Sequence, residues 1–330
     1  MPQDSESRIE QTARAVQEYL LERRDFAEPL EVRFLAAGEY NENYLVDHGG
    51  GQFVFRINHG SQLGLDDQIS YEYRVLETVA PSGVTPRPLF VDPEPERLPG
   101  GVLMMEYVHG GPLVYERDLD RAARIFARIH ALPAADNLVV QDRAVADIAE
   151  ESIGLIHRHP DHPRARVRDL LLAYHEEVMR LYEDTRHLFE AEDMVCVNTE
   201  VNSNNFVIGA DHSWLVDWEK AVVSHRYQDL GHFVVVTTSL WKTPTILTEG
   251  QKRNFLETYG IECERLGSPA PPLDELAEKT RVLEKTILLR ALSWCYMAWY
   301  EYTRTDRPIT NTDTFAKISE YLDNAECYLR

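Results

Sequence analysis

The chain has 330 residues and a formal net charge of −21, with 44% hydrophobic and 27% charged residues. This composition is typical of a globular protein with one large or two modest domains, and it excludes a disordered or collagen-like chain. The negative charge disfavours nucleic acid and anionic membranes as partners, because their phosphates carry the same sign and the sequence has no compensating basic patch. No run of 18 apolar residues and no secretory leader pattern occurs, so we expect a cytoplasmic protein.

The first third of the chain predicts a small antiparallel sheet with one inserted helix. A capping box of Ser7 and Glu10 is expected to begin the first helix. Short apolar runs interrupted by glycines then indicate strands. The expected elements are a helix up to residue 20, three strands over 31–58, a helix over 68–79 and strands near 87–91 and 102–107.

The remainder has the apolar spacing of helices, interrupted by one hairpin. Apolar residues at intervals of three and four predict helices over 119–132, 167–189, 273–302 and 315–329. The hairpin is expected between two short apolar runs, residues 205–208 and 213–217, joined by a turn that contains a glycine. A hairpin within a helical lobe, preceded by a sheet lobe, suits a ligand cleft between two lobes.

Polar side chains gather at one end of this hairpin. Glu200 and Asn205 precede its first strand, and Asp217 ends its second. Carboxylate and amide oxygens suit Mg²⁺, which takes one or two protein oxygens and completes its shell with phosphate and water. The alternative is that the asparagines of residues 198–205 only cap a polar loop. Spacing alone leaves both interpretations open.

Residues 198–205, 215–219 and 227–230 resemble three motifs of the aminoglycoside phosphotransferase and choline kinase family. These are the H-x-D-x-x-x-x-N catalytic loop, the I-D-W-E metal motif and the downstream D-L pair. The resemblance implies an α+β, bilobal, protein-kinase-like fold, with a small antiparallel-sheet N-terminal lobe and a larger, mostly helical C-terminal lobe. On this basis we expect a nucleotide-binding lobe over residues 1–105, followed by a hinge and catalytic lobe over 106–330.

The resemblance continues upstream, in the order that the family shows. Residues 38–44 resemble its G-x-x-N-x-x-Y nucleotide loop, residues 53–56 its strand with the phosphate-binding cation, and residues 104–110 its hinge. The resemblance implies nucleotide-binding roles for Gly38, Asn41, Tyr44, Arg56, Glu72, Glu106 and Val108.

These similarities imply an enzyme that moves the γ-phosphate of ATP or GTP to a hydroxyl of a small molecule, assisted by Mg²⁺. Asn205 and Asp217 would hold the metal, and Glu200 would orient the acceptor hydroxyl. A cationic acceptor would suit the acidic chain. The sequence identifies neither the acceptor nor the oligomeric state.

Three positions depart from the family pattern. Asn198, Glu200 and Arg56 stand where the family has His, Asp and usually Lys. Glu200 keeps a carboxylate but reaches one methylene further, and a displacement of about 1 Å can cost roughly a hundredfold in rate. The alternative function is therefore a pseudokinase, a nucleotide-binding regulatory or scaffold protein with little phosphotransfer activity.

Three further features have competing interpretations. His157, His159 and His162 are either metal ligands or, as the neighbouring prolines favour, part of a solvated loop. The aromatic residues of 294–302 either belong to a helical core or form a substrate wall. The four widely spaced cysteines are expected to be reduced thiols, and Cys196 is expected to be a small buried residue.

Overall fold

The computed structural model describes residues 2–38, 40–190, 192–304 and 312–330. Contacts divide the chain into two units, which are described separately. The sheet unit comprises Met1–Gly111, Ala135–Leu138 and Val207–Ala221. The helical unit comprises Pro112–Ala134, Val139–Phe206 and Val222–Arg330.

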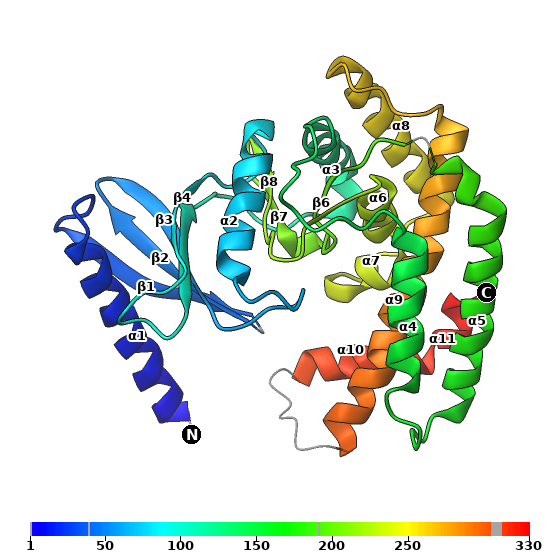
Figure 1. Ribbon diagram of the computed structural model, residues 1–330, viewed down its shortest axis with the longest axis horizontal. Coiled ribbons are helices and arrows are strands. Elements are labelled where there is room, and N and C mark those ends of the chain that lie inside the picture. The colour runs from blue at the N-terminus through cyan, green and yellow to red at the C-terminus, as the bar shows by residue number, and fades with distance from the viewer. Residues whose placement is uncertain (1, 39, 191, 305–311) are drawn as a thin grey trace. The chain divides into compact units, whose positions relative to one another are not determined.

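The sheet unit is built on a five-stranded antiparallel sheet (Figure 1). Its strands are β1 (Leu30–Ala37), β2 (Asn41–His48), β3 (Gly51–Asn58), β4 (Pro88–Asp92) and β5 (Gly101–Glu106), in the order β1-β2-β3-β5-β4. In the β2–β3 register, Asn43 lies opposite Arg56 and Tyr44 opposite Phe55. Because successive side chains alternate between faces, these two pairs occupy opposite faces of the sheet.

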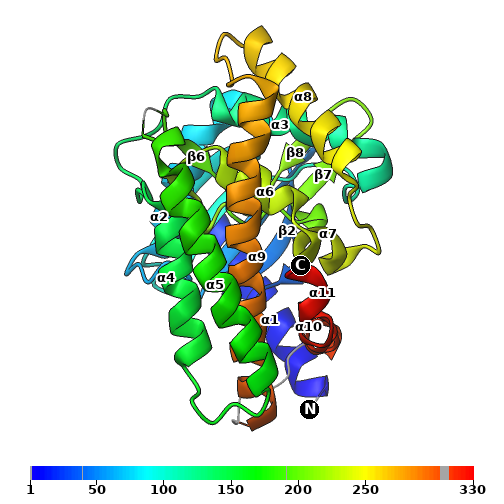
Figure 2. The same ribbon diagram turned by 90° about the vertical axis from the view of Figure 1, so that its right-hand side faces the viewer.

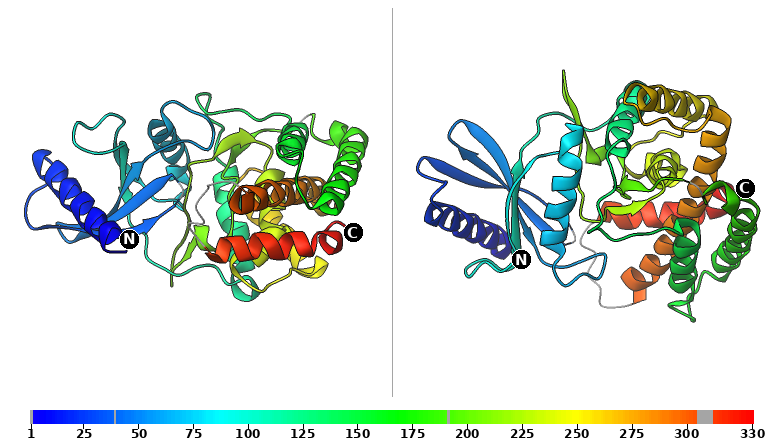
Figure 3. Two further views of the ribbon diagram at one scale, coloured as in Figure 1. Left: turned by 90° about the horizontal axis from the view of Figure 1, so that it is seen from below. Right: turned by 45° about the horizontal axis from the view of Figure 1, so that its top comes forward.

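One face of this sheet is dry. Tyr44 and Phe55 are fully buried there against Val16 and Leu20 of α1 (Pro2–Glu22), which packs along β1 (Figure 3). The second helix, α2 (Gln68–Val79), contacts β4 and β5 and is followed by the short η1 (Ala80–Ser82). Apolar contacts with α1 therefore cover one face of the sheet, while the opposite face, which carries Arg56, bears polar groups.

Two later segments complete the sheet unit. Strands β7 (Phe206–Ile208) and β8 (Ser213–Leu215) form the predicted hairpin. The chain that leaves β5 passes so close to β7 that a Cβ on Gly110 would lie 2.6 Å from the carbonyl oxygen of Ile208. Only glycine permits this approach without a shift of the backbone.

The helical unit surrounds a small β pair, β6 (Val195–Val197) and β9 (Val222–Ser224). Figure 2 shows α4, α5 and α9 side by side, as their contacts also indicate. The helices are α3 (Tyr115–His130), α4 (Ala144–His157), α5 (Ala165–Thr185), α6 (Tyr227–Val234), α7 (Val236–Lys242), α8 (Glu249–Arg265), α9 (Leu273–Arg304), α10 (Thr312–Asp323) and α11 (Ala325–Tyr328), with the short turns η2 (Arg186–Leu188) and η3 (Ser203–Asn205).

The predicted fold class is confirmed, with an antiparallel-sheet N-terminal part and a mostly helical C-terminal part. Two details were wrong. The first helix begins at Pro2, so Ser7 lies within it rather than capping it, and the helix expected over 315–329 is divided at Asn324. Among the described residues, no helix is long and apolar enough to span a membrane.

Candidate functional site

Two strained residues mark the region of interest. In the described part of the chain, Thr199 (φ 66°) and Asp217 (φ 67°) are the non-glycine residues with positive φ. Such a conformation costs about 1 to 3 kcal/mol and is a genuine outlier for a β-branched residue such as threonine. Thr199 belongs to the predicted catalytic loop and Asp217 to the predicted metal motif, and strain of this kind concentrates at functional sites.

The loop after β6 is held by one buried carboxylate. The backbone N–H groups of Asn198 and Thr199 each donate to Asp229 of α6, at 2.9 Å. The side-chain oxygen of Asn198 in turn accepts from the N–H of Glu200 at 3.1 Å. Glu200 is half-buried, whereas Asp229 is fully enclosed. The loop is therefore fixed through its backbone N–H groups.

Asn205 is oriented by the same loop. Its Nδ2 donates to the carbonyl oxygen of Glu200 at 2.5 Å. Because the amide nitrogen of Asn205 bonds within the loop, its oxygen Oδ1 is the side-chain atom that can coordinate a cation. Asn205 directly precedes β7, and Asp217 comes shortly after β8 of the same hairpin. An amide oxygen and a carboxylate are donors that suit a hard cation.

In the sheet unit, Arg56 of β3 is the centre of a buried charge cluster. Its Nη1 donates to Glu72 of α2 at 2.5 Å and lies 3.4 Å from Asp217, and its Nε donates to Asn43 at 2.9 Å. Burial lowers the pKa of Arg56, but the charges of Glu72, Asp217 and Glu219 outweigh it and the net shift is upward. Arg56 is therefore a permanent cation, and its Nη2 donates to none of the described residues.

Glu72 is the most enclosed member of this cluster. Its side chain is 1% exposed, and burial raises its pKa against the opposing effect of Arg56. Its second oxygen, Oε2, is buried without a hydrogen-bond partner among the described residues. An ion pair with so little access to water needs both members, because either one alone would be a buried, unpaired charge.

Glu219 ties the loop after β1 to the chain after β8. One of its carboxylate oxygens accepts from Asn41, the other accepts from Gln62 at 2.7 Å, and its backbone carbonyl accepts from Gln68 at 2.7 Å. Asn41 also accepts from Asn58 at 2.9 Å. The sequence motif contained Glu219 but gave it no role. The structure shows that Glu219 accepts a hydrogen bond from Asn41, so the side chain of Asn41 helps to hold the loop.

The other predicted residues of the nucleotide loop lie differently. The N–H of Gly38 donates to the carbonyl of Asn41 at 2.8 Å and closes the turn, while Glu39 lies outside the described residues. Tyr44 lies on the dry face of the sheet, opposite the face of Arg56, and its hydroxyl donates to Glu42 at 2.9 Å. The structure therefore brings Arg56, Glu72, Asn41 and Asp217 together and leaves Tyr44 in the core.

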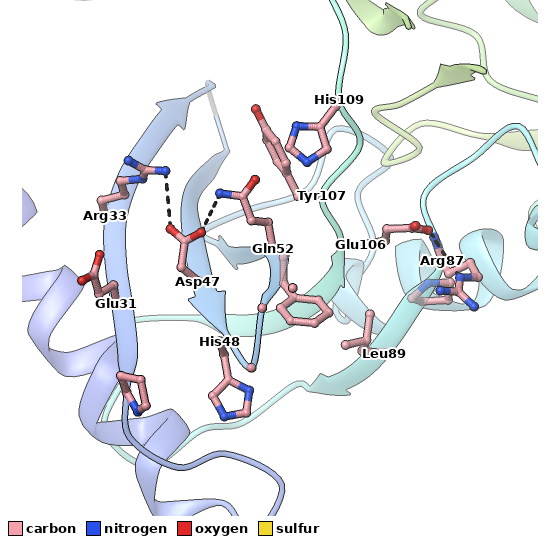
Figure 4. A pocket seen from close by; sticks show the side chains of 16 residues that line it. Glu31, Arg33, Asp47, His48, Gln52, Arg87, Leu89, Glu106, Tyr107 and His109 are labelled. Carbon is pink, nitrogen blue, oxygen red and sulfur yellow. Dashed lines mark hydrogen bonds and ion pairs between the residues drawn. The ribbon is translucent and has the colours of Figure 1, made fainter. Parts of the chain in front are cut away.

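An open pocket of about 1130 Å³ lies beside the β2–β3 turn (Figure 4). Asp47 and Gln52, which line it, are on the same face of the sheet as Arg56 by the strand register. Asp47 lies between Arg33, at 3.4 Å, and Gln52, which donates to it at 2.5 Å (Figure 4). The predicted hinge lines the pocket through Glu106, Tyr107 and His109. A concave, polar surface thus adjoins the hinge segment within a single unit.

Backbone groups of the hinge differ in their use. The N–H of Glu106 donates to the backbone carbonyl of Arg87 at 2.9 Å, and that of Tyr107 donates to the backbone carbonyl of Gln52 at 3.2 Å. Val108 follows, half-buried, and its N–H donates to no backbone acceptor among the residues described. The backbone N–H of Val108 can therefore donate a hydrogen bond to a planar, ring-shaped ligand.

The histidine-rich turn between α4 and α5 is a packing junction. His162 was expected in a solvated loop, which is wrong: it is 5% exposed, its ring stacks on Tyr296 at 3.6 Å, and its Nε2 is 2.9 Å from the carbonyl of Tyr296. His159 stacks on Tyr300 at 4.3 Å. At least these two aromatic residues of α9, Tyr296 and Tyr300, therefore pack against the turn. Cys196 is buried as expected, and burial raises the pKa of its thiol.

Comparisons with known proteins identify a family for this chain. The chain matches the model of the phosphotransferase enzyme family over residues 31–269. A comparison with curated protein sequences gives no match.

Solved structures show the same fold. A choline/ethanolamine kinase family protein from Mesorhizobium loti aligns with a TM-score of 0.62 at 18% identity, covering 96% of this chain and 94% of that one. Choline kinase from Streptococcus pneumoniae gives 0.61 at 17% identity, covering 94% and 99%. A spectinomycin phosphotransferase in complex with ADP and spectinomycin gives 0.59 at 12% identity, covering 96% and 98%.

The fold thus places the chain in the protein-kinase-like class that these kinases share. Within that class, the chain belongs to the phosphotransferase enzyme family.

Proposed function

We propose that the chain is a kinase that transfers the γ-phosphate of ATP or GTP to a hydroxyl of a small molecule, with Mg²⁺ as cofactor. The observation that carries the proposal is the Arg56 guanidinium, held between Glu72 and Asp217 on the polar face of the sheet. A permanent cation beside a metal-type carboxylate is what phosphoryl transfer requires, because this reaction depends mainly on positioning and charge neutralisation. The family supports the same reaction class.

In this proposal Arg56 binds the nucleotide phosphates through Nη2, while Nη1 and Nε keep it in place. Its fork-shaped guanidinium suits phosphate oxygens. Glu72 orients Arg56, and the turn of Gly38, braced by Asn41 and Glu219, lies over the phosphates. The base would bind at the hinge, between Glu106 and Val108. The spectinomycin phosphotransferase of the same fold was solved with ADP, which supports a nucleotide here.

Asn205 and Asp217 would hold Mg²⁺. Their donor chemistry fits this ion: the Asn205 nitrogen is bound to the loop and leaves the oxygen as donor, and Asp217 is fixed at a strained backbone position. When bound, the ion neutralises phosphate charge as the γ-phosphoryl leaves. Both residues border the same hairpin, which supports a shared role.

Glu200 would orient the acceptor hydroxyl and accept its proton. Its backbone is bonded on both sides, by Asn198 through its N–H and by Asn205 through its carbonyl. These bonds hold the residue through its backbone. Asn198 therefore supports the loop in place of the family's histidine, and a glutamate in this setting can supply the proton acceptor that the reaction requires.

The acceptor is proposed to be small and, given the charge of −21, cationic. The cited relatives are named for choline, ethanolamine and spectinomycin as substrates, which supports this size class. The exclusion of nucleic acid and membrane partners and the cytoplasmic location remain predictions from the sequence.

The test has two stages. Binding to the folded state raises stability by RT ln(1 + [L]/Kd), about 2.7 kcal/mol at a hundredfold excess over Kd, so millimolar Mg-ATP or Mg-GTP should raise Tm. ADP release is then followed with a panel of amino alcohols, amino sugars and other hydroxyl compounds. A Tm rise without turnover for any acceptor would favour the pseudokinase, and no Tm rise would contradict both nucleotide functions.

A further inference from the structure

We propose that Arg8 of α1 is a positioning residue for the nucleotide loop, residues 38–44, and that it acts through Glu42. Both residues belong to the sheet unit. This role rests on the proposed function, because the nucleotide is the ligand that the loop would cover. It also gives a task to a helix that lies outside every motif of the sequence.

Side chains at the start of β2 alternate between the two faces of the sheet. Asn43 bonds to Arg56 on the polar face. Glu42, one residue earlier, points to the opposite face together with Tyr44, whose hydroxyl donates to its Oε2 at 2.9 Å. The Glu42 side chain is only 10% exposed. A carboxylate on the apolar face needs a cation beside it, because burial penalises an unpaired charge.

Arg8 supplies that charge. Its Nη2 donates to Oε1 of Glu42 at 2.5 Å. His59 Nε2 lies 3.7 Å from the same oxygen, but a histidine is charged only when protonated, whereas a guanidinium is always charged. In the described part of the chain, Arg8 is therefore the permanent cation that contacts Glu42. The Arg8 side chain is 70% exposed, so its removal opens no cavity.

Tyr44 connects this ion pair to both strands of the loop. Its ring packs edge-on against Phe34 of β1, with 5.8 Å between the ring centroids, and its hydroxyl bonds to Glu42 of β2. Burial raises the pKa of Tyr44 to about 12, so the hydroxyl keeps the proton that it donates to Glu42. Thr12, one turn after Arg8 on α1, also interacts with this hydroxyl. The helix therefore meets the base of the loop through two of its side chains.

Loss of Arg8 should loosen the turn of the loop. Glu42 would keep its hydrogen bond from Tyr44 but lose its permanent cation, which favours a movement of the carboxylate toward water. Glu42 directly follows Asn41, whose carbonyl accepts from the Gly38 N–H that closes the turn. A shift of the backbone at Glu42 therefore acts on the bond that shapes the turn.

Amide hydrogen exchange of the full chain, followed by NMR, tests this coupling without a nucleotide. The N–H groups of Gly38 and His59 donate to the carbonyls of Asn41 and Tyr40, so both report on the loop. In Arg8→Ala we expect these two amides to exchange about fivefold faster, with the amides of β5 as the internal reference. Arg8→Lys keeps the charge and should restore most of the protection.

Arg14→Ala is the matched control, because it removes another exposed arginine of α1. It should leave both amides unchanged. Glu42→Gln keeps an acceptor for Tyr44 but carries no charge, so adding Arg8→Ala to it should change nothing further. Wild-type exchange in Arg8→Ala, equal acceleration in Arg14→Ala, or the same acceleration by Arg8→Ala with and without Glu42→Gln would overturn the inference. If Glu42→Gln does not fold, the comparison of Arg8→Ala with Arg8→Lys and Arg14→Ala decides.

Calorimetry and kinetics with Mg-ATP or Mg-GTP provide the second arm. Arg8→Ala should raise the nucleotide Kd and KM about threefold to fivefold, while kcat changes little because Arg8 is proposed to touch neither phosphate nor acceptor. An unchanged Kd, or a loss that falls on kcat instead, would contradict a role in positioning the nucleotide loop. If wild type binds neither nucleotide while the exchange pattern is seen, the proposed function fails and the coupling of α1 to the loop stands.

Discussion

The charge cluster of the sheet unit and the loop of the helical unit are stabilised in different ways. Around Arg56, side chains hold one another: a guanidinium, two carboxylates and an amide make direct contacts. Around Asp229, one carboxylate holds backbone N–H groups instead. The difference teaches that substitutions near Arg56 should alter what the site binds, whereas substitutions around Asp229 should alter where the loop places its groups.

The largest effect is expected for Asp217→Ala. The change removes a carboxylate from the proposed metal site and from Arg56 without opening a core cavity, because Asp217 is half-exposed. Nucleotide affinity in the presence of Mg²⁺ should fall by about a hundredfold or more, roughly 2.7 kcal/mol, as measured by calorimetry. Asp211→Ala, at the exposed turn of the same hairpin, is the control. Unchanged Mg²⁺ dependence in Asp217→Ala would refute the metal assignment.

Glu200→Gln should separate the two regions most clearly. The substitution keeps the size of the side chain and its backbone bonds but removes the proton acceptor, so turnover should fall about 10²-fold or more while nucleotide Kd stays the same. Steady-state kinetics and calorimetry on one preparation measure both quantities. Glu200→Asp asks whether the loop is built around the longer side chain. A parallel loss of affinity and turnover in Glu200→Gln would mean that this carboxylate belongs to the binding cluster.

Arg56→Lys should have a smaller effect, confined to the sheet unit. A lysine can keep the ion pair with Glu72 but cannot also donate to Asn43 and offer a second nitrogen to phosphate. Nucleotide affinity should fall about tenfold, equivalent to roughly 1.4 kcal/mol, with a smaller change in the rate of the bound complex. Arg97→Lys, at an exposed arginine between β4 and β5 of the same unit, is the matched control. Equal affinities for Arg56→Lys and wild type would show that the guanidinium fork is not used.

The sheet and α2 could be predicted within a few residues because alternation, glycine turns and a helical period are local signals. The helix α8 was not predicted, although Thr248 and Gln251 form a capping box at its start. The break at Asn324 was missed because that side chain bonds back to the carbonyl of Glu320, a competition that the apolar spacing does not reveal.

The residues of the site also divide into those that sequence motifs identify and those that they do not. Arg56 and Glu72 came from motif order, and the structure pairs them. The buried contacts of His130 with Asp229 and Tyr259 join three helices that are distant in sequence, and they span 99 and 129 residues. No local pattern marks such a set, and its members have no spacing in common. Tyr44 is the opposite case, since it occupies a position of the nucleotide-loop motif but belongs to the hydrophobic core of the sheet unit.

The smallest effect is expected for Asn41→Ala, which tests whether the nucleotide loop is held by Glu219. The change leaves one oxygen of a buried carboxylate without its donor, which costs about 1 to 3 kcal/mol of stability, but it removes no group proposed to touch phosphate. We therefore expect a lower Tm and a nucleotide KM raised only a few-fold, with kcat preserved. Asn204→Ala, an exposed asparagine, is the control and should change neither quantity. Because Gln62 still donates to Glu219, the double variant Asn41→Ala with Gln62→Ala should lose more than the two single variants together. A strict sum would show that the two donors act independently, and a loss of kcat in Asn41→Ala would place this asparagine on the reacting groups rather than on the loop.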